Sequence, residues 1–112
     1  MTSEPRQFRV AAERLGTDGL IVVQGELDIA TLPELEEAVA RMRSEGLERL
    51  VIDLRELAFL DSMSIELLLR LHGELTAAGA QLVIVRGPPA VNRVFDLMEL
   101  ERVLTLVDEP PA

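Results

Sequence analysis

Asp61 and Ser62 have the clearest chemical potential in this sequence, because they lie where a strand pattern gives way to a helix pattern. An apolar run at residues 50–54 precedes them, and the longest helical pattern of the chain follows. Either side chain can cap this helix, since its oxygen can accept a hydrogen bond from a first-turn amide. The positive end of a helix dipole also accommodates an added phosphate. An accessible Ser62 is therefore a candidate phosphorylation switch.

No catalytic set accompanies this serine. The single histidine, His72, lies about two and a half turns further along the same predicted helix, so the two do not form a nucleophile–base pair. The sequence lacks a Gly-x-x-x-x-Gly-Lys phosphate loop and a Rossmann glycine fingerprint. With one histidine and no cysteine, it also lacks the usual ligands of a metal cluster. We expect no enzyme, no catalytic residues, no metal and no cofactor, and we expect His72 to be packed against its helix's apolar face.

Length and charge restrict the classes of partner. The 112 residues correspond to one domain, 1–112, in which residues 1–6 and 108–112 are expected to be flexible tails. The formal net charge of −9 repels nucleic acid and anionic membrane surfaces. No apolar run approaches the ~18 residues of a membrane span, and no apolar segment of a signal peptide follows the N-terminus. These features predict a cytoplasmic protein with no nucleic-acid partner and no membrane insertion.

Hydrophobic periodicity predicts strands that alternate with helices. Strand patterns occur at residues 7–12, 20–24, 50–54 and 81–86, and a last helical turn and strand are expected within 100–107. Thr31 and Glu34 have the spacing of a capping box, with Pro33 in the first turn. The helix that follows has an apolar face at helical spacing and ends at Gly46; the face consists of Leu35, Ala38, Val39 and Met42. A short helix after residues 87–89 has Val91, Val94, Phe95 and Met98 at helical spacing.

Alternating strands and helices with apolar strands indicate βαβ units and an α/β fold. We expect a mixed, mostly parallel sheet of about four to five strands packed against about four helices. The strand at residues 7–12 is the best candidate for an antiparallel outer strand. The helix from Ser62 is expected to end near Gly79.

Several of these segments together resemble the STAS domain, specifically the small bacterial anti-sigma factor antagonists. The resemblance covers essentially the whole chain from the strand at residue 20 to the last helix. None of the segments is specific alone, but their order and spacing are. They are Gly25-Glu26-Leu27-Asp28 followed by Thr31, the strand at 50–54, Phe59-Leu60-Asp61-Ser62, and Val94-Phe95-Asp96 with Leu100.

The resemblance implies a switch by phosphorylation. In such proteins the serine after the motif aspartate is phosphorylated by a partner that is both an anti-sigma factor and a serine kinase. By position this serine is Ser62, and Asp28 resembles a family aspartate placed near it. The unphosphorylated antagonist binds the anti-sigma factor and frees the sigma factor; the phosphorylated form lets go, and a phosphatase restores it. The implied partner-binding residues are Asp28, Asp61, Ser62, Met63, Ser64 and Glu66.

The sequence departs from the family pattern at the motif glycines. The family usually reads Asp-Ser-Ser/Thr-Gly-Leu-Gly, whereas Met63, Ser64, Ile65 and Glu66 stand at the last four positions here. Glu99 also replaces a glycine that often follows Phe-Asp-x-x. Glu66 adds bulk and negative charge at the expected docking surface. We expect Met63 to be exposed contact surface and Met98 to be core. Ser64, a weaker phosphoacceptor candidate than Ser62, is expected to be a surface residue of the first turn.

The sequence is also compatible with other interpretations. Ser62 can be an ordinary N-cap, Asp61 an alternative N-cap, and Asp28 a simple turn residue. The lost glycines at Ser64 and Glu66 favour a second hypothesis, a STAS scaffold or ligand-responsive subunit of a transporter or signalling complex whose binding ignores Ser62. A nucleotide-binding or nucleotide-hydrolysing protein is a distant third.

Overall fold

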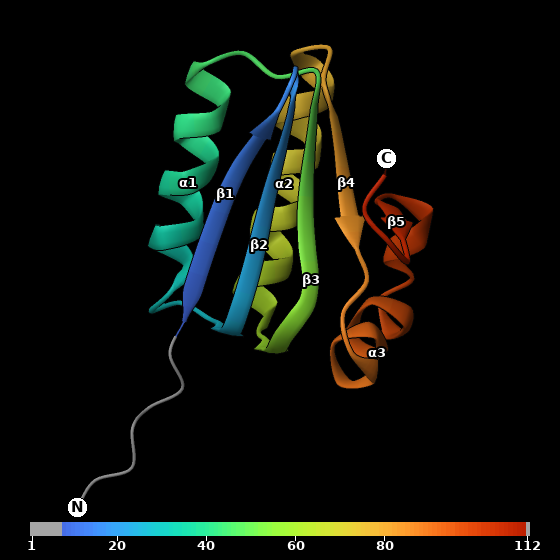
Figure 1. Cartoon of the computed structure of the whole chain (residues 1–112). Helices are drawn as coiled ribbons and strands as arrows, with labels where there is room; N and C mark the ends of the chain where they lie inside the picture. The colour runs from blue at the N-terminus through green and yellow to red at the C-terminus, as the bar shows by residue number, and fades with distance from the viewer. Residues whose placement is uncertain (1–7, 112) are drawn as a thin grey trace, which may run out of the picture.

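Five strands form one sheet in the order β1-β2-β3-β4-β5 in the computed structural model, which describes residues 8–111 (Figure 1). β1 pairs with β2 in antiparallel orientation, and the other neighbouring strands are parallel. The elements are β1 (Arg9–Leu15), β2 (Asp18–Leu27), α1 (Leu32–Ser44), β3 (Arg49–Leu60), α2 (Ser62–Ala77), β4 (Gln81–Val85), α3 (Pro89–Leu97), the 3-10 helix η1 (Leu100–Arg102) and β5 (Thr105–Val107).

The predicted α/β class is confirmed, and so is the antiparallel first strand. Gln7, which the prediction placed in that strand, lies outside the described residues. The number of helices differs from the prediction: residues 8–111 contain three α-helices and one 3-10 helix of three residues, rather than about four helices. No helix in this part of the chain is both long and apolar enough to cross a membrane.

Helices α1 and α2 cover the same face of the sheet, behind the strands in Figure 1. The predicted apolar face of α1 is buried there, since Leu35, Ala38, Val39 and Met42 all belong to the main core cluster. Gly46 and Gly79 follow α1 and α2 with φ of +81° and +80°. Because L side chains avoid this left-handed region, the two glycines end their helices where the sequence predicted. These two helices therefore have fixed positions and lengths on the sheet.

Strand β3 is longer than predicted, continuing from residue 54 to Leu60. Its apolar pattern is interrupted by Arg55 and Glu56, which is why the sequence suggested an earlier end. The pairing with β2 continues past this point through two register shifts and reaches Leu27 opposite Leu60. The carboxyl ends of β2 and β3 therefore lie side by side, and the chain leaves both at the same edge of the sheet.

The predicted capping box at the start of α1 is wrong. Thr31 occupies the N-cap position, but its side chain makes no capping hydrogen bond. Its Oγ1 instead donates to the Glu26 carbonyl at 2.9 Å and accepts from the Asp28 amide at 2.9 Å. The hydroxyl therefore joins the end of β2 to the loop that leads into α1.

Met98 is exposed, which contradicts its assignment to the core. Its side chain is 51% exposed, whereas Val91 and Phe95 of α3 are buried. Helix α3 ends at Leu97 and Met98 is its C-cap, so the helical spacing that placed Met98 inward no longer applies. Glu99 follows with φ 52° and ψ 41°, a left-handed conformation, at the position where the family pattern has glycine.

The variant Glu99→Gly is expected to raise the free energy of unfolding by about 1 kcal/mol, because glycine adopts the left-handed region without steric cost. The exposed ion pair of Glu99 with Arg102 at 3.4 Å would be lost, but surface pairs contribute little. Urea unfolding measures the difference. The matched control is Glu101→Gly in η1, which is expected to be neutral or destabilising. A destabilised Glu99→Gly variant would contradict the inference that the left-handed backbone of Glu99 carries a steric cost.

Candidate functional site

The site forms where the chain leaves β2 and β3. The Asp61 amide donates to the Leu27 carbonyl at 3.2 Å, which joins the end of β3 to the end of β2. Asp28 follows Leu27 directly, and its Oδ1 accepts from the amides of Ala30 at 2.9 Å and Thr31 at 3.2 Å. Both aspartates are thus held at the carboxyl edge of the sheet, where binding sites of α/β proteins collect.

Asp61 is the N-cap of α2. Its Oδ1 accepts from the Ser64 amide at 2.9 Å, so one of the unpaired amides of the first turn is satisfied. Of the two predicted cap residues, the structure therefore selects Asp61. Ser62 becomes the first residue of the helix.

Ser64 is fully buried, so the prediction that it is a surface residue is wrong. Its Oγ lies 2.8 Å from both the Leu27 carbonyl oxygen and Asp61 Oδ1, and its single proton faces these two acceptors. The hydroxyl can be buried because the hydrogen bond that it gives up with water is replaced by one to the end of β2. Ser64 thus connects α2 to β2 beneath the surface. Of the two glycine positions occupied by larger residues, only Glu66 changes the exposed face.

The pKa of Asp61 is lowered. Burial, the largest single influence, raises this pKa, but hydrogen bonds from the Ser64 amide, the Ser64 hydroxyl and the Ile29 amide together outweigh it. The carboxylate form is the one that these donors stabilise. At every pH at which Asp61 is ionised in the unfolded chain, it is therefore also ionised in the folded protein.

Stability is expected to depend on Asp61 in acid. A carboxyl group whose pKa is lower in the folded state stabilises the fold above its unfolded pKa of about 3.9, and this contribution disappears as the pH falls through the folded pKa. Asp61→Asn retains a capping oxygen without the charge. Urea unfolding of both proteins is expected to show a stability difference that shrinks as the pH falls below about 4. A difference independent of pH would contradict this assignment.

Ser62 is exposed at the N-terminus of α2. Within residues 8–111 its hydroxyl makes no hydrogen bond. The hydroxyl is therefore accessible for modification, and it lies at the positive end of a 16-residue helix.

The surface around Ser62 has an apolar part that the sequence only partly indicated. Met63 is 44% exposed, as predicted, whereas Leu60 and Ile65 belong to the core. Ile29 and Phe59 are 69% and 48% exposed. Ile29 was not identified from the sequence as part of this surface. Its position as a large apolar residue in the loop directly after Asp28 could have indicated it.

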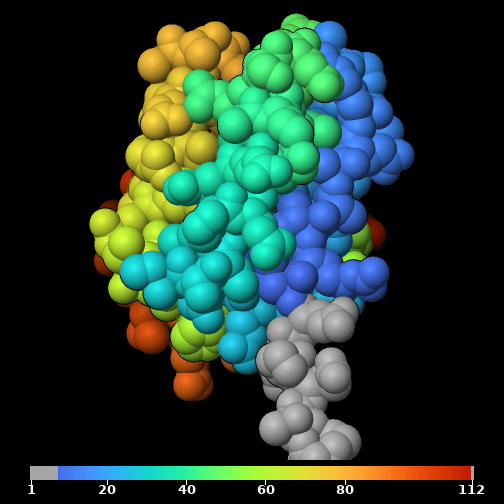
Figure 2. Space-filling model, turned by 90° about the vertical axis from the view of Figure 1, so that its left-hand side faces the viewer, coloured from blue at the N-terminus to red at the C-terminus, as the bar shows by residue number. Residues whose placement is uncertain are grey.

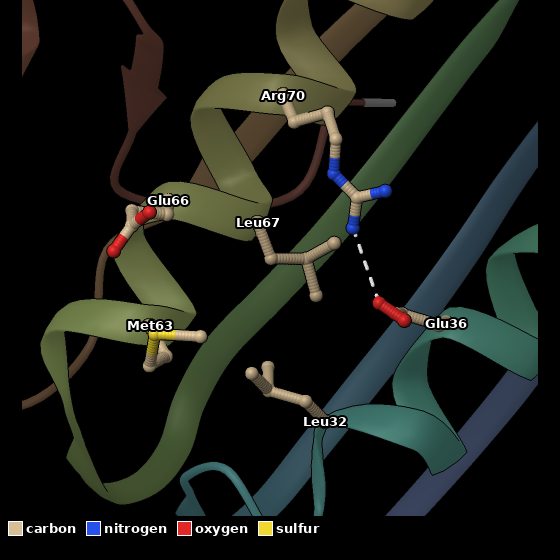
Figure 3. A pocket seen from close by; sticks show the side chains of 6 residues that line it. All are labelled: Leu32, Glu36, Met63, Glu66, Leu67 and Arg70. Atoms are coloured by element: carbon tan, nitrogen blue, oxygen red, sulfur yellow. Dashed lines mark hydrogen bonds and ion pairs between the residues drawn. The ribbon is translucent and has the colours of Figure 1, made fainter.

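A groove of about 320 Å³ lies between α1 and the first turns of α2 (Figure 3). Arg70 Nη2 and Glu36 Oε1 form an ion pair at 3.1 Å at one side of it. Its lining residues are Leu32, Glu36, Met63, Glu66, Leu67 and Arg70. The sequence did not reveal this groove, because its two walls are about 30 residues apart in the chain.

Two further polar residues lie apart from this network. Asp53 is buried on β3, and its Oδ2 accepts from Arg55 Nη2 at 2.8 Å. This hydrogen bond raises the pKa of the Arg55 guanidinium. His72 is half-buried in α2, and its Nδ1 is shielded from solvent without a hydrogen-bond partner among the described residues. No group of three or more histidine or carboxylate side chains in residues 8–111 is arranged to hold a metal ion.

Comparison with known proteins places this geometry in a family. The anti-sigma-B factor antagonist of Staphylococcus epidermidis is 31% identical over 84 residues, which cover 75% of this chain and 78% of that protein. The anti-sigma factor antagonist of Mycobacterium paratuberculosis has a similar crystal structure, with a TM-score of 0.80, 28% identity, and 96% and 92% of the two chains covered.

The Bacillus cell fate determinant SpoIIAA, solved in its phosphorylated form, shares the fold with a TM-score of 0.68 and 19% identity. The match covers 92% of this chain and 93% of that one. The sequence pattern of the STAS domain matches residues 9–110. This chain therefore belongs to the STAS domain family.

Proposed function

We propose that this protein is an anti-sigma factor antagonist, which binds an anti-sigma factor and thereby releases a sigma factor. Curated relatives and structural neighbours named anti-sigma factor antagonists support this function. The proposed contact surface surrounds the start of α2 and includes Asp28, Asp61, Ser62, Met63 and Glu66. Ser64 supports this surface from below through its contacts with Leu27 and Asp61.

Ser62 is the proposed switch. The observation that carries this assignment is the contrast between two neighbouring serines: Ser62 is exposed at the helix N-terminus, whereas Ser64 is buried and hydrogen-bonded. An anti-sigma factor with serine kinase activity would phosphorylate Ser62, and a phosphatase would remove the phosphate, in the cytoplasm. The chain itself contributes binding and a phosphate acceptor rather than catalysis.

Electrostatics explains how the phosphate acts in this proposal. It adds about −1.5 to −2 charge directly beside the Asp61 carboxylate and one helical turn from Glu66. The amide end of α2 can accommodate this charge within the antagonist itself. A partner surface that fits the unmodified serine would instead face an unmatched anion and lose complementarity.

The second candidate function is a STAS scaffold or ligand-responsive subunit that binds independently of Ser62. Glu66 favours it, because this exposed carboxylate stands at the docking surface where the family pattern has glycine. The first function requires that binding releases a sigma factor and depends on the state of Ser62, whereas the second requires neither.

A displacement assay tests the first function. Complexes of each anti-sigma factor from the same genome with its labelled sigma factor are titrated with the purified protein. Fluorescence anisotropy is expected to show release of sigma from one complex at near-stoichiometric concentrations. If the protein binds an anti-sigma factor while sigma stays bound, the first function is contradicted.

A further inference from the structure

The groove between α1 and α2 has an apolar interior that opens to solvent. Leu32 and Leu67 form buried walls, and Met63 lies over them with 44% of its surface exposed. Figure 2 shows the face on which α1 and α2 lie side by side, and Figure 3 shows the three side chains turned toward one another. A volume of about 320 Å³ is at the lower end of the range for ligand pockets, so it suits one or two inserted side chains.

The charges at this groove are not balanced. Arg70 is already paired with Glu36, so its charge is matched within the chain. Glu66 lies on the same side of the groove as Met63, and its carboxylate points away from that pair (Figure 3). It makes no ion pair with any residue between 8 and 111. The groove thus presents one unmatched carboxylate beside an apolar opening, in a protein whose net charge is −9.

We propose that this groove is a selectivity pocket for the anti-sigma factor, which inserts an aliphatic side chain next to Met63 and pairs a lysine or arginine with Glu66. This inference rests on the proposed function. Met63 follows Ser62 directly, so one partner surface can cover both the groove and the switch. The thioether of Met63 is flexible and adapts its shape to an inserted side chain. Because Glu66 demands a basic residue opposite, it discriminates among anti-sigma factors by the charge that they present.

Binding of purified anti-sigma factors from the same genome tests the pocket. Met63→Asp places a charge in the apolar opening, and Glu66→Lys reverses the charge that the partner is proposed to match. Each is expected to raise the Kd for the cognate anti-sigma factor about tenfold or more. The control is Glu48→Lys, which changes the net charge equally but lies before β3, at the opposite end of the strands; its Kd is expected to stay within about twofold. Thermal unfolding verifies that all three variants fold.

The outcomes separate the pocket from the function. If the wild-type protein binds no anti-sigma factor, the proposed function fails and the pocket fails with it. If the wild type binds, but Met63→Asp and Glu66→Lys bind as tightly as Glu48→Lys, only the pocket is overturned. A change in self-association without a change in anti-sigma binding would also overturn it, since the occupant would then be a second copy. The pairing is supported if changing one arginine or lysine of the anti-sigma factor to glutamate restores its binding to the Glu66→Lys variant.

Discussion

Replacing Ser62 by aspartate is expected to weaken binding to the anti-sigma factor by about a hundredfold or more, whereas Ser62→Ala leaves the Kd within about threefold. The aspartate places a permanent charge on the exposed first residue of α2, next to the Asp61 carboxylate. Inside the complex this charge would lose its hydration without gaining an oppositely charged partner. Its free energy is therefore much less favourable in the complex than in the free, hydrated protein. Alanine removes only a hydroxyl that has no hydrogen bond within residues 8–111.

Isothermal titration of the two variants against the cognate anti-sigma factor measures this difference. Ser62→Asn is the matched control, because it has the size of aspartate without the charge. Binding by Ser62→Asn near the wild-type level would assign the loss to charge rather than to bulk. Equal binding by Ser62→Asp and Ser62→Ala would remove the switch from the account.

The second large effect concerns stability. Asp61→Ala is expected to lower the free energy of unfolding by about 1 to 2 kcal/mol, because the N-cap of α2 is lost together with one of the two acceptors that the Ser64 hydroxyl faces. The buried Ser64 hydroxyl still donates to the Leu27 carbonyl in this variant, so the unpaired first-turn amide is the main loss. Urea unfolding at neutral pH measures the change.

Two comparisons verify the cause of that effect. Ser62→Ala, one residue further on, is expected to change the unfolding free energy by less than about 0.5 kcal/mol, because its side chain is exposed. The double variant Asp61→Ala, Ser64→Ala is expected to lose less unfolding free energy than the sum of the losses in the two single variants, since the residues share a hydrogen bond. A destabilisation by Asp61→Ala no larger than that of Ser62→Ala would contradict the role of Asp61 as the cap.

Local sequence signals predicted the features that depend on periodicity and on special backbone conformations. The apolar face of α1 from Leu35 to Met42 is buried as its spacing required, and Gly46 and Gly79 end their helices. The apolar strands alternate with helices, which was sufficient to predict a mostly parallel sheet. The position of Ser62 at the start of a helix also followed from the strand-to-helix transition.

The features that the sequence missed depend on tertiary contacts. Ser64 turns inward because the Leu27 carbonyl lies at the end of a strand that is distant in sequence. Thr31 bonds to Glu26 and Asp28 rather than capping α1, since the loop supplies closer backbone partners than the helix does. β3 continues through Arg55 and Glu56 because register shifts preserve its pairing with β2. No local pattern encodes any of these contacts.

Phosphate transfer to Ser62 provides a direct test of the proposed switch. The purified protein is incubated with ATP and each anti-sigma factor of the same genome, and the products are read by intact mass and peptide mapping. We predict one added phosphate on Ser62 with a single anti-sigma factor, and none on Ser62→Ala. A protein that forms a stable complex with that factor but stays unmodified, or is modified elsewhere, would contradict the switch.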